Sequence, residues 1–402
     1  MHVLLALTAV VITGRVLGKL LASIGQPPVV GDILAGILLG PSLLGRVSPD
    51  LAAVILPRRV APSLSVIAQL GIVLYMFLVG LELDAGKLRG RARTMVVISH
   101  ASIVVPFTLG VLLASPLYAD LAPPGVSFIA FALFIGVAMS ITAFPVLARI
   151  LTDGRMAHTE LGVTALTCAA VDDVTAWCLL AFVAGVARAA VGDALMVVLL
   201  TLGFIGVMFL IARPLAARAL ARTDRDPPSH EAIALTFVGV LASALTTERI
   251  GIHAIFGAFL FGAIVPSRTA LARALVLRLR DVVTILLLPA FFAFTGMRTE
   301  IGLLSGPREW AMCGAVVLVA TAGKFGGTFV AAWLTGREPR FAAALGILMN
   351  TRGLMELIVL NVGLDLGVIS PALFTMMVLM AVVTTLATTP ALRLVWKTPR
   401  GS

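Results

Sequence analysis

The sequence LTCAAVDDVTAW, residues 166–177, constrains the fold because it places two adjacent carboxylates inside an apolar run. That run extends from about 158 to 186 and is long enough to cross a bilayer, which takes about 20 apolar residues. An ionised side chain near the bilayer centre is costly, so Asp172 and Asp173 must face protein, water or an ion. The pair is therefore either an ion site or a structural pair bonded to helix ends or to a nearby base.

The composition is that of a polytopic membrane protein. Of the 402 residues, 60% are hydrophobic and 12% are charged, whereas soluble domains are about 25% charged. The net charge of +10 does not indicate nucleic-acid binding, because the bases are spread over short connections between apolar runs. The three cysteines fall inside apolar runs and give neither a disulfide framework nor a metal-ligand spacing. We expect no cofactor.

Apolar runs joined by short connections predict thirteen transmembrane helices and no appended soluble domain. The expected spans are residues 3–23, 28–44, 62–83, 94–114, 127–150, 158–186, 192–221, 230–247, 251–266, 281–297, 309–335, 341–362 and 370–396. If the N-terminus lies outside, most of the 30 Lys and Arg residues fall in inner connections such as 87–93, 213–225 and 268–280. This bias predicts that the N-terminus is outside and the C-terminus is cytoplasmic.

The two halves of the chain resemble each other in sequence. The matching segments are 24–41 with 250–266, 80–84 with 296–300, and 136–140 with 346–350. Six spans return a chain to its starting side and a seventh crosses over, so the second six-helix repeat must be inverted relative to the first. Inverted repeats with a site near the midplane are typical of secondary transporters.

Two spans at matching positions of the repeats are interrupted. In the first, Pro145 removes a backbone donor and disfavours helical geometry at the preceding residue. In the second, Gly353 and several polar residues interrupt an otherwise apolar helix. Such breaks indicate a binding site in transporters, although each is also compatible with a simple kink. The expected ligands on the unwound segments are Thr142, Ala143, Asn350 and Thr351.

Five charged residues lie near mid-span. They are Asp172, Asp173, Lys324, Arg352 and Glu356. Lys324 lies at about the depth of the aspartates, so one of them is its natural partner. Arg352 and Glu356 are four residues apart and can pair on one helix face, for which we favour a structural role.

These charges suggest a chemistry of exchange. Burial disfavours an ionised carboxylate, whereas a neighbouring ammonium favours it, so an aspartate between these influences can hold either a proton or a small cation. Oxygen ligands suit hard cations such as Na⁺ or K⁺. We assign cation binding mainly to Asp173 and the salt bridge with Lys324 mainly to Asp172, although the sequence does not separate the two roles.

Glu82 and Arg298 occupy matching repeat positions at the ends of spans. The inversion places them on opposite membrane faces, so we do not expect them to pair with each other. The expected behaviour of each is to extend its charged end toward the membrane interface.

At these residues the chain resembles the monovalent cation:proton antiporters, in the branch that holds bacterial Kef-like and NapA-like exchangers and plant cation/H⁺ exchangers. The motifs that carry the resemblance are GDILAGILLGP (31–41), FLVGLE (77–82), SITAFPVLAR (140–149), the Asp172–Asp173 pair, Lys324, and NTRGLMEL (350–357). In this family the second aspartate binds the ion, and the first pairs with the lysine in members that are commonly electrogenic.

The resemblance also implies an architecture: an all-α membrane protein of the NhaA/NapA-like fold, with crossed discontinuous helices, that forms a homodimer. A dimerisation panel of about 1–84 and 229–300 and a core transport bundle of about 93–186 and 309–396 would be joined by a linker helix at about 192–221. The core would move like an elevator against the panel. The implied activity is Na⁺ or K⁺/H⁺ antiport in a bacterial inner membrane, with a role in pH homeostasis.

Two other functions fit an inverted-repeat scaffold: a sodium-coupled organic-anion carrier and a non-transporting membrane sensor. Adjacent aspartates with a mid-span lysine favour proton competition over the first, and the lack of an apparent output domain disfavours the second. We do not expect an enzyme, because the sequence contains no H-E-x-x-H, no G-x-S-x-G and no His/Cys cluster.

Overall fold

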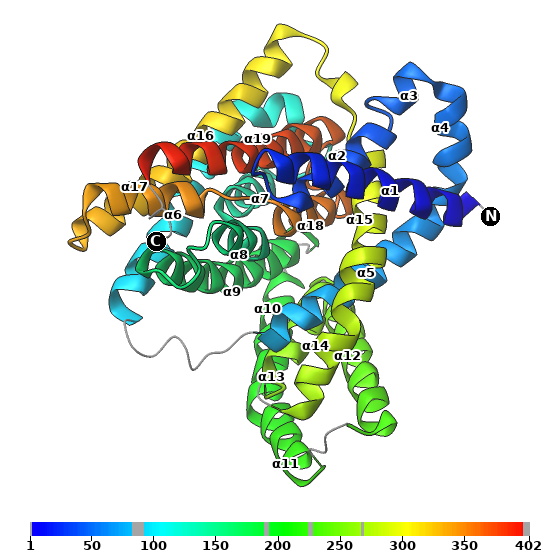
Figure 1. Ribbon diagram of the computed structural model, residues 1–402, viewed down its shortest axis with the longest axis vertical. Helices are drawn as coiled ribbons and strands as arrows, with labels where there is room; N and C mark the ends of the chain where they lie inside the picture. Colours follow the sequence, from blue (N-terminus) through cyan, green and yellow to red (C-terminus); the bar gives the residue numbers. More distant parts are fainter. Residues whose placement is uncertain (1, 83–91, 189–192, 224–227, 267–268, 397–402) are drawn as a thin grey trace.

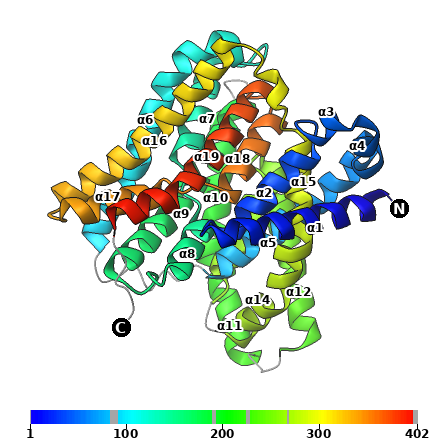
Figure 2. The ribbon, with the colours of Figure 1, turned by 45° about the horizontal axis from the view of Figure 1, so that its top comes forward.

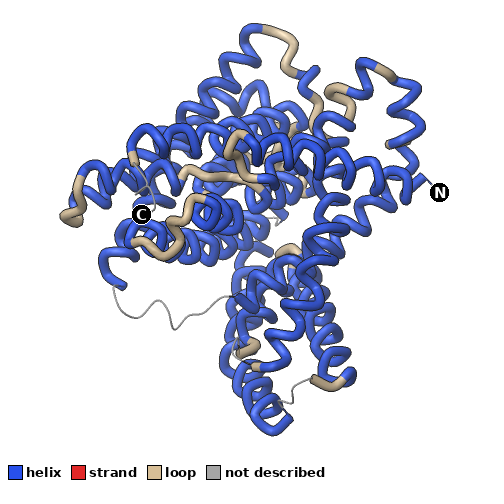
Figure 3. Tube along the Cα trace, viewed as in Figure 1, coloured by secondary structure: helices blue, strands red, loops and turns tan. Residues whose placement is uncertain are grey.

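A computed structural model describes residues 2–82, 92–188, 193–223, 228–266 and 269–396. Within these ranges the chain is helical and contains no strand (Figure 3). The basic segments 83–91, 224–227, 267–268 and 397–402, on which the orientation prediction partly rests, lie outside the described residues.

The elements follow one another in this order along the chain. They are α1 (His2–Ser23), α2 (Pro28–Leu39), α3 (Leu44–Val47), α4 (Pro49–Ile55), η1 (Arg58–Val60), α5 (Ala61–Glu82), α6 (Ala92–Leu121), α7 (Phe128–Ser140), α8 (Phe144–Asp153), α9 (Glu160–Arg188), α10 (Asp193–Val207), η3 (Met208–Ala212), α11 (Arg213–Thr223), α12 (His230–Ile250), α13 (Ala254–Ile264), α14 (Ala270–Asp281), η4 (Val282–Leu287), α15 (Leu288–Met297), η5 (Ile301–Leu303), α16 (Pro307–Leu334), α17 (Pro339–Met349), α18 (Leu354–Asp365) and α19 (Pro371–Val395).

Ten helices of the described residues are long and apolar enough to cross a membrane. An eleventh span results if α17 and α18, which are bent by 45° at their junction, count as one. The chain is therefore an integral membrane protein, but the prediction of thirteen spans is not confirmed. The predicted span 251–266 shows why the two numbers differ. It corresponds to the short helix α13, whose 11 residues extend over about 16 Å, well short of the roughly 30 Å hydrocarbon core.

The segment before residue 281, which was expected to be an inner connection between spans, is helical. α14 begins at Ala270, where the Thr269 hydroxyl accepts a hydrogen bond from the N–H of Ala272, and it continues through the π-helical turn η4 into α15. The helix is amphipathic: Leu271 and Leu275 are buried, whereas Arg278 is exposed. Its charged face lowers the average hydropathy, which is why apolar runs alone place it outside a helix.

The helices form two groups that lie side by side in Figures 1 and 2. In the panel group (α1, α2, α5 and α12–α15), α5 packs against α13 and α15, and α2 packs against α1 and α15. In the core group (α6–α9 and α16–α19), α6 packs against α7, α9 and α16. The run α10–η3–α11 contacts α9 of the core group and α12 and α13 of the panel group, so it connects the two.

Glycines allow close helix crossings inside the panel group. A Cβ atom on Gly296 of α15 would collide with the backbone of Gly36 on α2. Gly80 of α5 and Gly262 of α13 meet in the same way, since a Cβ on either would lie 3.0 Å from the Cα atom of the other. Only glycine permits helix backbones to approach this closely.

The main apolar core lies between and within the two groups. It includes Phe77 of α5 and Phe259 of α13 from the panel group, and Phe134 of α7 and Phe374 of α19 from the core group. By contrast, large apolar side chains are exposed along α1, α10–η3–α11 and α12. Extensive exposed apolar surface of this kind indicates contact with lipid.

Candidate functional site

The unwound residues between α7 and α8 lie beside those between α17 and α18. The N–H of Ala143 donates to the carbonyl oxygen of Thr351 over 2.9 Å, so a main-chain hydrogen bond joins the two breaks. Pro145 lies in the first turn of α8, and Gly353 directly precedes α18. Four helix ends therefore converge at one place, and each brings main-chain groups that lack helical partners.

Asp172 of α9 is fully buried, and four donors lie within hydrogen-bond distance of its carboxylate. Oδ1 accepts from the hydroxyl of Ser99 at 2.6 Å. Oδ2 accepts from Nζ of Lys324 at 2.9 Å and from the hydroxyls of Ser102 at 2.7 Å and Thr142 at 3.1 Å. These donors come from three directions, on α6, α16 and the break after α7.

Lys324 of α16 is also fully buried, and all three protons of its ammonium have acceptors. Besides Asp172, Nζ donates to the main-chain carbonyls of Ser102 at 2.9 Å and Ser140 at 2.5 Å. Of the two aspartates, it is Asp172 that forms the ion pair with this lysine. A buried ion pair is tolerated only when further hydrogen bonds satisfy both partners, as they do here.

Asp173 differs from its neighbour in having an oxygen without a partner in the described part of the chain. Successive residues on an α-helix point about 100° apart, so the side chain of Asp173 leaves the helix in another direction. It is 4% exposed, and its Oδ1 atom has no hydrogen-bond partner among the described residues. The Oδ1 atom of Asn350, at the end of α17, is likewise buried without a described partner. Such atoms are rare in folded proteins. A bound cation would satisfy both, whereas a proton would satisfy the carboxylate of Asp173.

Arg352 closes the open end of α7. Its guanidinium donates to the carbonyls of Ala138 at 2.9 Å and Met139 at 2.6 Å, and to Oε2 of Glu356 at 2.9 Å. Both charged side chains of this pair are fully buried. Because Lys324 bonds the carbonyl of the next residue, Ser140, two cations cover the end of α7 where the helix dipole is negative.

The expected ligands on the unwound segments other than Asn350 also have contacts in the structure. The hydroxyl of Thr142 lies between Oδ2 of Asp172 and the carbonyl of Met349, at 3.1 Å from each. Ala143 and Thr351 bond each other through their main chains, and the hydroxyl of Thr351 donates to the carbonyl of Leu348. The side chain of Thr142 thus faces Asp172.

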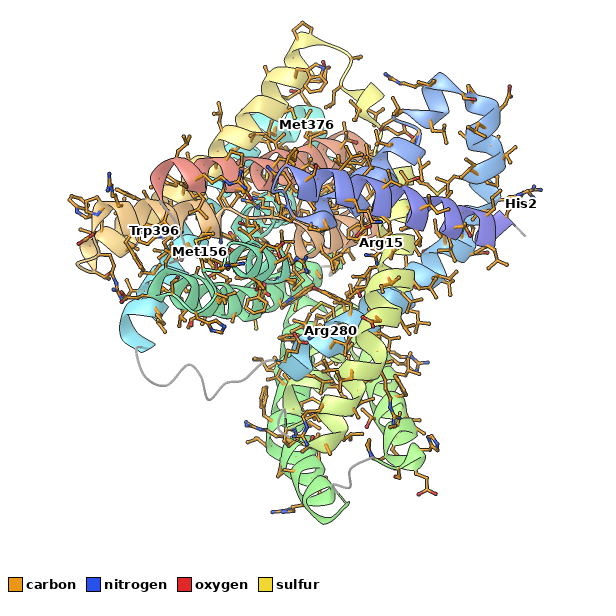
Figure 4. The ribbon with its side chains drawn as sticks, in the orientation of Figure 1. His2, Arg15, Met156, Arg280, Met376 and Trp396 are labelled. Carbon is orange, nitrogen blue, oxygen red and sulfur yellow. The ribbon has the colours of Figure 1, made fainter. Side chains whose placement is uncertain are left out.

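The charges at the span ends have partners other than each other. Arg298, which was expected to extend toward the interface, reaches α18, where it pairs with Asp365 at 2.6 Å and donates to Oδ1 of Asn361 at 3.1 Å. Glu82 pairs with Arg280, labelled in Figure 4 where α14 runs beside α5.

Ser99 and Ser102 were not identified from the sequence. Serine is common in membrane helices because its hydroxyl can bond within its own helix, so two serines in an apolar run carry no signal of their own. The only available sign was their spacing of three residues, which places both on one face of α6. That face meets α9.

The described residues contain no group of three or more His, Cys, Asp or Glu side chains that could hold a metal ion. The buried oxygen atoms at the breaks instead offer hard ligands of low total charge, which suit a monovalent cation or a proton.

The profile of the sodium/hydrogen exchanger transmembrane family matches residues 4–397. The chain belongs to the sodium/hydrogen exchanger family. This is a family of membrane transporters, and the matched range includes both helix breaks and every charged residue described above.

Individual relatives agree with the family assignment. The chain is 46% identical over 388 residues to the Na⁺/H⁺ antiporter NhaS4 of Synechocystis, covering 96% of this chain and 95% of that protein. It is 40% identical over 417 residues to cation/H⁺ antiporter 20 of Arabidopsis thaliana, covering 99% and 49%. It is 35% identical over 381 residues to K⁺/H⁺ antiporter 1 of Saccharomyces cerevisiae, covering 92% and 44%. The chain thus spans about half the length of these plant and yeast relatives.

A solved exchanger structure has the same fold. The sodium proton antiporter MjNhaP1 of Methanocaldococcus jannaschii superposes with a TM-score of 0.70 over 99% of both chains, at 14% sequence identity. At this identity the likeness extends to the helix arrangement only. The present chain and MjNhaP1 therefore share a helix arrangement although their sequences are very different.

Proposed function

We propose that this exchanger is a secondary active antiporter that moves a monovalent cation, Na⁺ or K⁺, against protons. The observation that carries the proposal is the buried carboxylate of Asp173, whose Oδ1 atom has no partner in the described part of the chain, next to a second carboxylate that is fully paired. Relatives named as Na⁺/H⁺ and K⁺/H⁺ antiporters support the reaction and leave both cations open.

Competition at the Asp172–Asp173 pair, mainly at Asp173, would couple the two fluxes. A carboxylate binds either a proton or a cation at one time, so loading one releases the other. The Oδ1 atom of Asn350 and main-chain carbonyls of the unwound segments are available to complete the cation shell, as in other transporters with broken helices. Arg352 and Glu356 then have a structural role, since they close the end of α7.

Alternating access would come from elevator-like movement of the core group against the panel group. The proposed panel covers about 1–84 and 229–300, the core about 93–186 and 309–396, and the linker helix about 192–221. The support is that every described donor to Asp172 belongs to the core group, whose helices pack mainly on one another. The site would therefore move as a unit.

Inverted repeats would supply the symmetry that such a movement needs. The sequence matches relate Gly36 to Gly262 and Gly80 to Gly296. Under that relation the crossing of Gly36 with Gly296 becomes the crossing of Gly262 with Gly80, and both crossings are present. The glycines that follow α1 and α12, Gly25 and Gly251, also share positive φ angles of 78° and 100°. These reciprocal contacts support the repeat.

We further propose a homodimer in a bacterial inner membrane, with the N-terminus outside and the C-terminus cytoplasmic. The exposed apolar side chains of α1 give one surface on which a second copy or lipid could pack. The bias of Lys and Arg toward one set of connections supports the orientation.

The test is proton flux in proteoliposomes loaded with a pH-sensitive dye, to which Na⁺, K⁺, Li⁺ or choline chloride is added in turn. We expect flux with Na⁺, K⁺ or both, none with choline, and loss of that flux in Asp173→Asn. The matched control is Asp50→Asn, which changes an exposed aspartate of α4 in the same way. Full activity of folded Asp173→Asn would refute the site assignment, and no flux with any cation from folded wild type would refute the antiporter.

A further inference from the structure

We propose that Ser99 and Ser102 are positioning residues that keep Asp172 ionised and paired with Lys324 throughout transport, so that Asp173 alone alternates between one cation and one proton. This rests on the proposed function and adds its stoichiometry, which becomes one cation for one proton. It departs from the resemblance to two-aspartate exchangers, which are commonly electrogenic.

The first argument is the geometry on α6. Ser99 and Ser102 lie one turn apart, and each donates to a different oxygen of Asp172, at 2.6 and 2.7 Å. Ser99 donates to nothing else in the described contacts, whereas the single proton of Ser102 is shared with the carbonyl of Ser99 at 2.8 Å. Together the two hydroxyls hold both oxygens of Asp172, which fixes the plane of its carboxylate.

The second argument is the number of donors. With Thr142 and Lys324, four donors lie within hydrogen-bond distance of the carboxylate of Asp172, and the hydroxyls of Ser102 and Thr142 each share their one proton with a main-chain carbonyl. Hydrogen bonds to the ionised form of a carboxyl favour that form. A proton on either oxygen would displace at least one of these donors. It would also leave the buried ammonium of Lys324 without an ionised partner among the described residues, because its other two acceptors are neutral carbonyls. Neutralising Asp172 therefore weakens the interactions of both Asp172 and Lys324.

The third argument is where the network lies. The donors and acceptors around Asp172 belong to α6, α16 and the α7–α8 segment, all within the core group. A movement of this group against the panel group leaves these bonds intact. Of the two aspartates, Asp173 carries the oxygen that has no partner among the described residues, so it is the carboxylate free to exchange its ligand.

Other titratable or charged side chains lie around Asp172 and Asp173. Among the described hydrogen bonds, none of them donates to the carboxylate oxygens of Asp172 that Ser99 and Ser102 hold. Cys168 precedes Asp172 by one turn on α9, and Tyr75 of α5 interacts electrostatically with Asp173 from the panel group. Arg352 and Glu356 act on Lys324 and on each other from the second break.

The exchange step balances without any further participant. The protonated carboxyl of Asp173 releases its proton as a cation binds to the resulting carboxylate, and the reverse happens on the other side. The site carries the same net charge with a proton as with a cation. Exchange therefore moves no net charge across the membrane, provided that Asp172 and Lys324 keep their charges.

The experiment uses the full chain in proteoliposomes and has two readouts. The first is charge movement on a solid-supported membrane after a step in NaCl or KCl, and the second is the slope of the logarithm of the apparent KM for the cation against pH. For wild type we expect no sustained charge movement and a limiting tenfold rise in apparent KM per unit fall in pH. A sustained current, or a limiting hundredfold rise per unit, would overturn the proposal.

The variants test the serines directly. In Ser99→Ala/Ser102→Ala, Asp172 can take a proton, so the slope should rise above tenfold per unit and a current should appear. Ser99→Thr, which keeps the hydroxyl, should behave like wild type, and so should Ser243→Ala, which removes a buried helix hydroxyl in the panel group. If the double variant does not fold, Ser99→Ala alone should show the same changes in part.

Failures of the two proposals can be told apart. If wild type is electroneutral but folded serine variants match it in slope and current, the serines do not hold Asp172 and the inference is wrong. If folded wild type exchanges no cation at all, the proposed function itself has failed.

Discussion

Two ion pairs of similar length have opposite surroundings. Lys324 and Asp172 are 2.9 Å apart with both side chains fully buried, and both belong to the core group. Arg298 and Asp365 are 2.6 Å apart with side-chain exposures of 21% and 47%, and they join α15 of the panel group to α18 of the core group. The first pair is fixed within a unit, whereas the second bridges two units that the proposed mechanism moves apart.

The comparison teaches that distance does not measure what an ion pair contributes. Removing one partner of a buried pair leaves an uncompensated charge and costs about 3–5 kcal/mol. An exposed pair exchanges its partner for water and contributes about 0.2–1 kcal/mol. We therefore expect variants at the first pair to damage the fold and variants at the second to change transport.

The largest effect should come from Lys324→Met, which keeps the apolar length of the side chain and removes its charge. Asp172 then loses its counter-charge in a fully buried place, so we expect destabilisation of about 3–5 kcal/mol. Thermal unfolding of purified protein in detergent measures it.

The double variant Lys324→Met/Asp172→Asn separates charge from packing. If the loss comes from an uncompensated carboxylate, the double variant should recover much of the Tm that Lys324→Met loses. A double variant no more stable than Lys324→Met would contradict this explanation and would indicate that the bonds of Nζ to the carbonyls of Ser102 and Ser140 matter more.

A smaller effect should follow from Arg352→Lys, which keeps the charge but removes the planar fork. Arg352 bonds Ala138, Met139 and Glu356 at once, and an ammonium at the end of a shorter chain cannot reach all three. One buried carbonyl left without a donor costs about 1–3 kcal/mol. We expect the fall in Tm to be smaller than that of Lys324→Met and larger than that of a variant at the Arg298–Asp365 pair. An unchanged Tm would refute the role of Arg352 in closing the end of α7.

Part of this site could be predicted from the sequence because some of its residues are energetically costly to place inside a membrane helix. Asp172, Asp173 and Lys324 interrupt apolar runs, where an ionised group needs a reason to be present. Pro145 and Gly353 mark the breaks for the same kind of reason, since each disrupts helical geometry. Such residues stand out without knowledge of any contact.

Other parts could not be predicted because their residues are compatible with several environments. Ser99 and Ser102 fit any membrane helix, so their role emerges only when α9 is packed against α6. Arg298 near a span end is equally compatible with water and with a partner. The helix α14 was missed because its Arg side chains lower the local hydropathy, although its buried leucines repeat at helical spacing.

The smallest effect on stability should come from Arg298→Gln, which removes the bridging charge at a partly exposed place. We expect destabilisation of no more than about 1 kcal/mol, seen as a small shift in Tm. The same variant should alter the apparent KM or the turnover rate for the cation, because the pair joins the two groups that must move relative to each other.

The charge swap Arg298→Asp/Asp365→Arg should restore part of the wild-type rate if the pair acts as a bridge. Arg280→Gln is the matched control, since its pair with Glu82 lies within the panel group. If both variants change transport equally, the bridging position of Arg298 has no special effect, and the contrast between the two kinds of ion pair would reduce to burial alone.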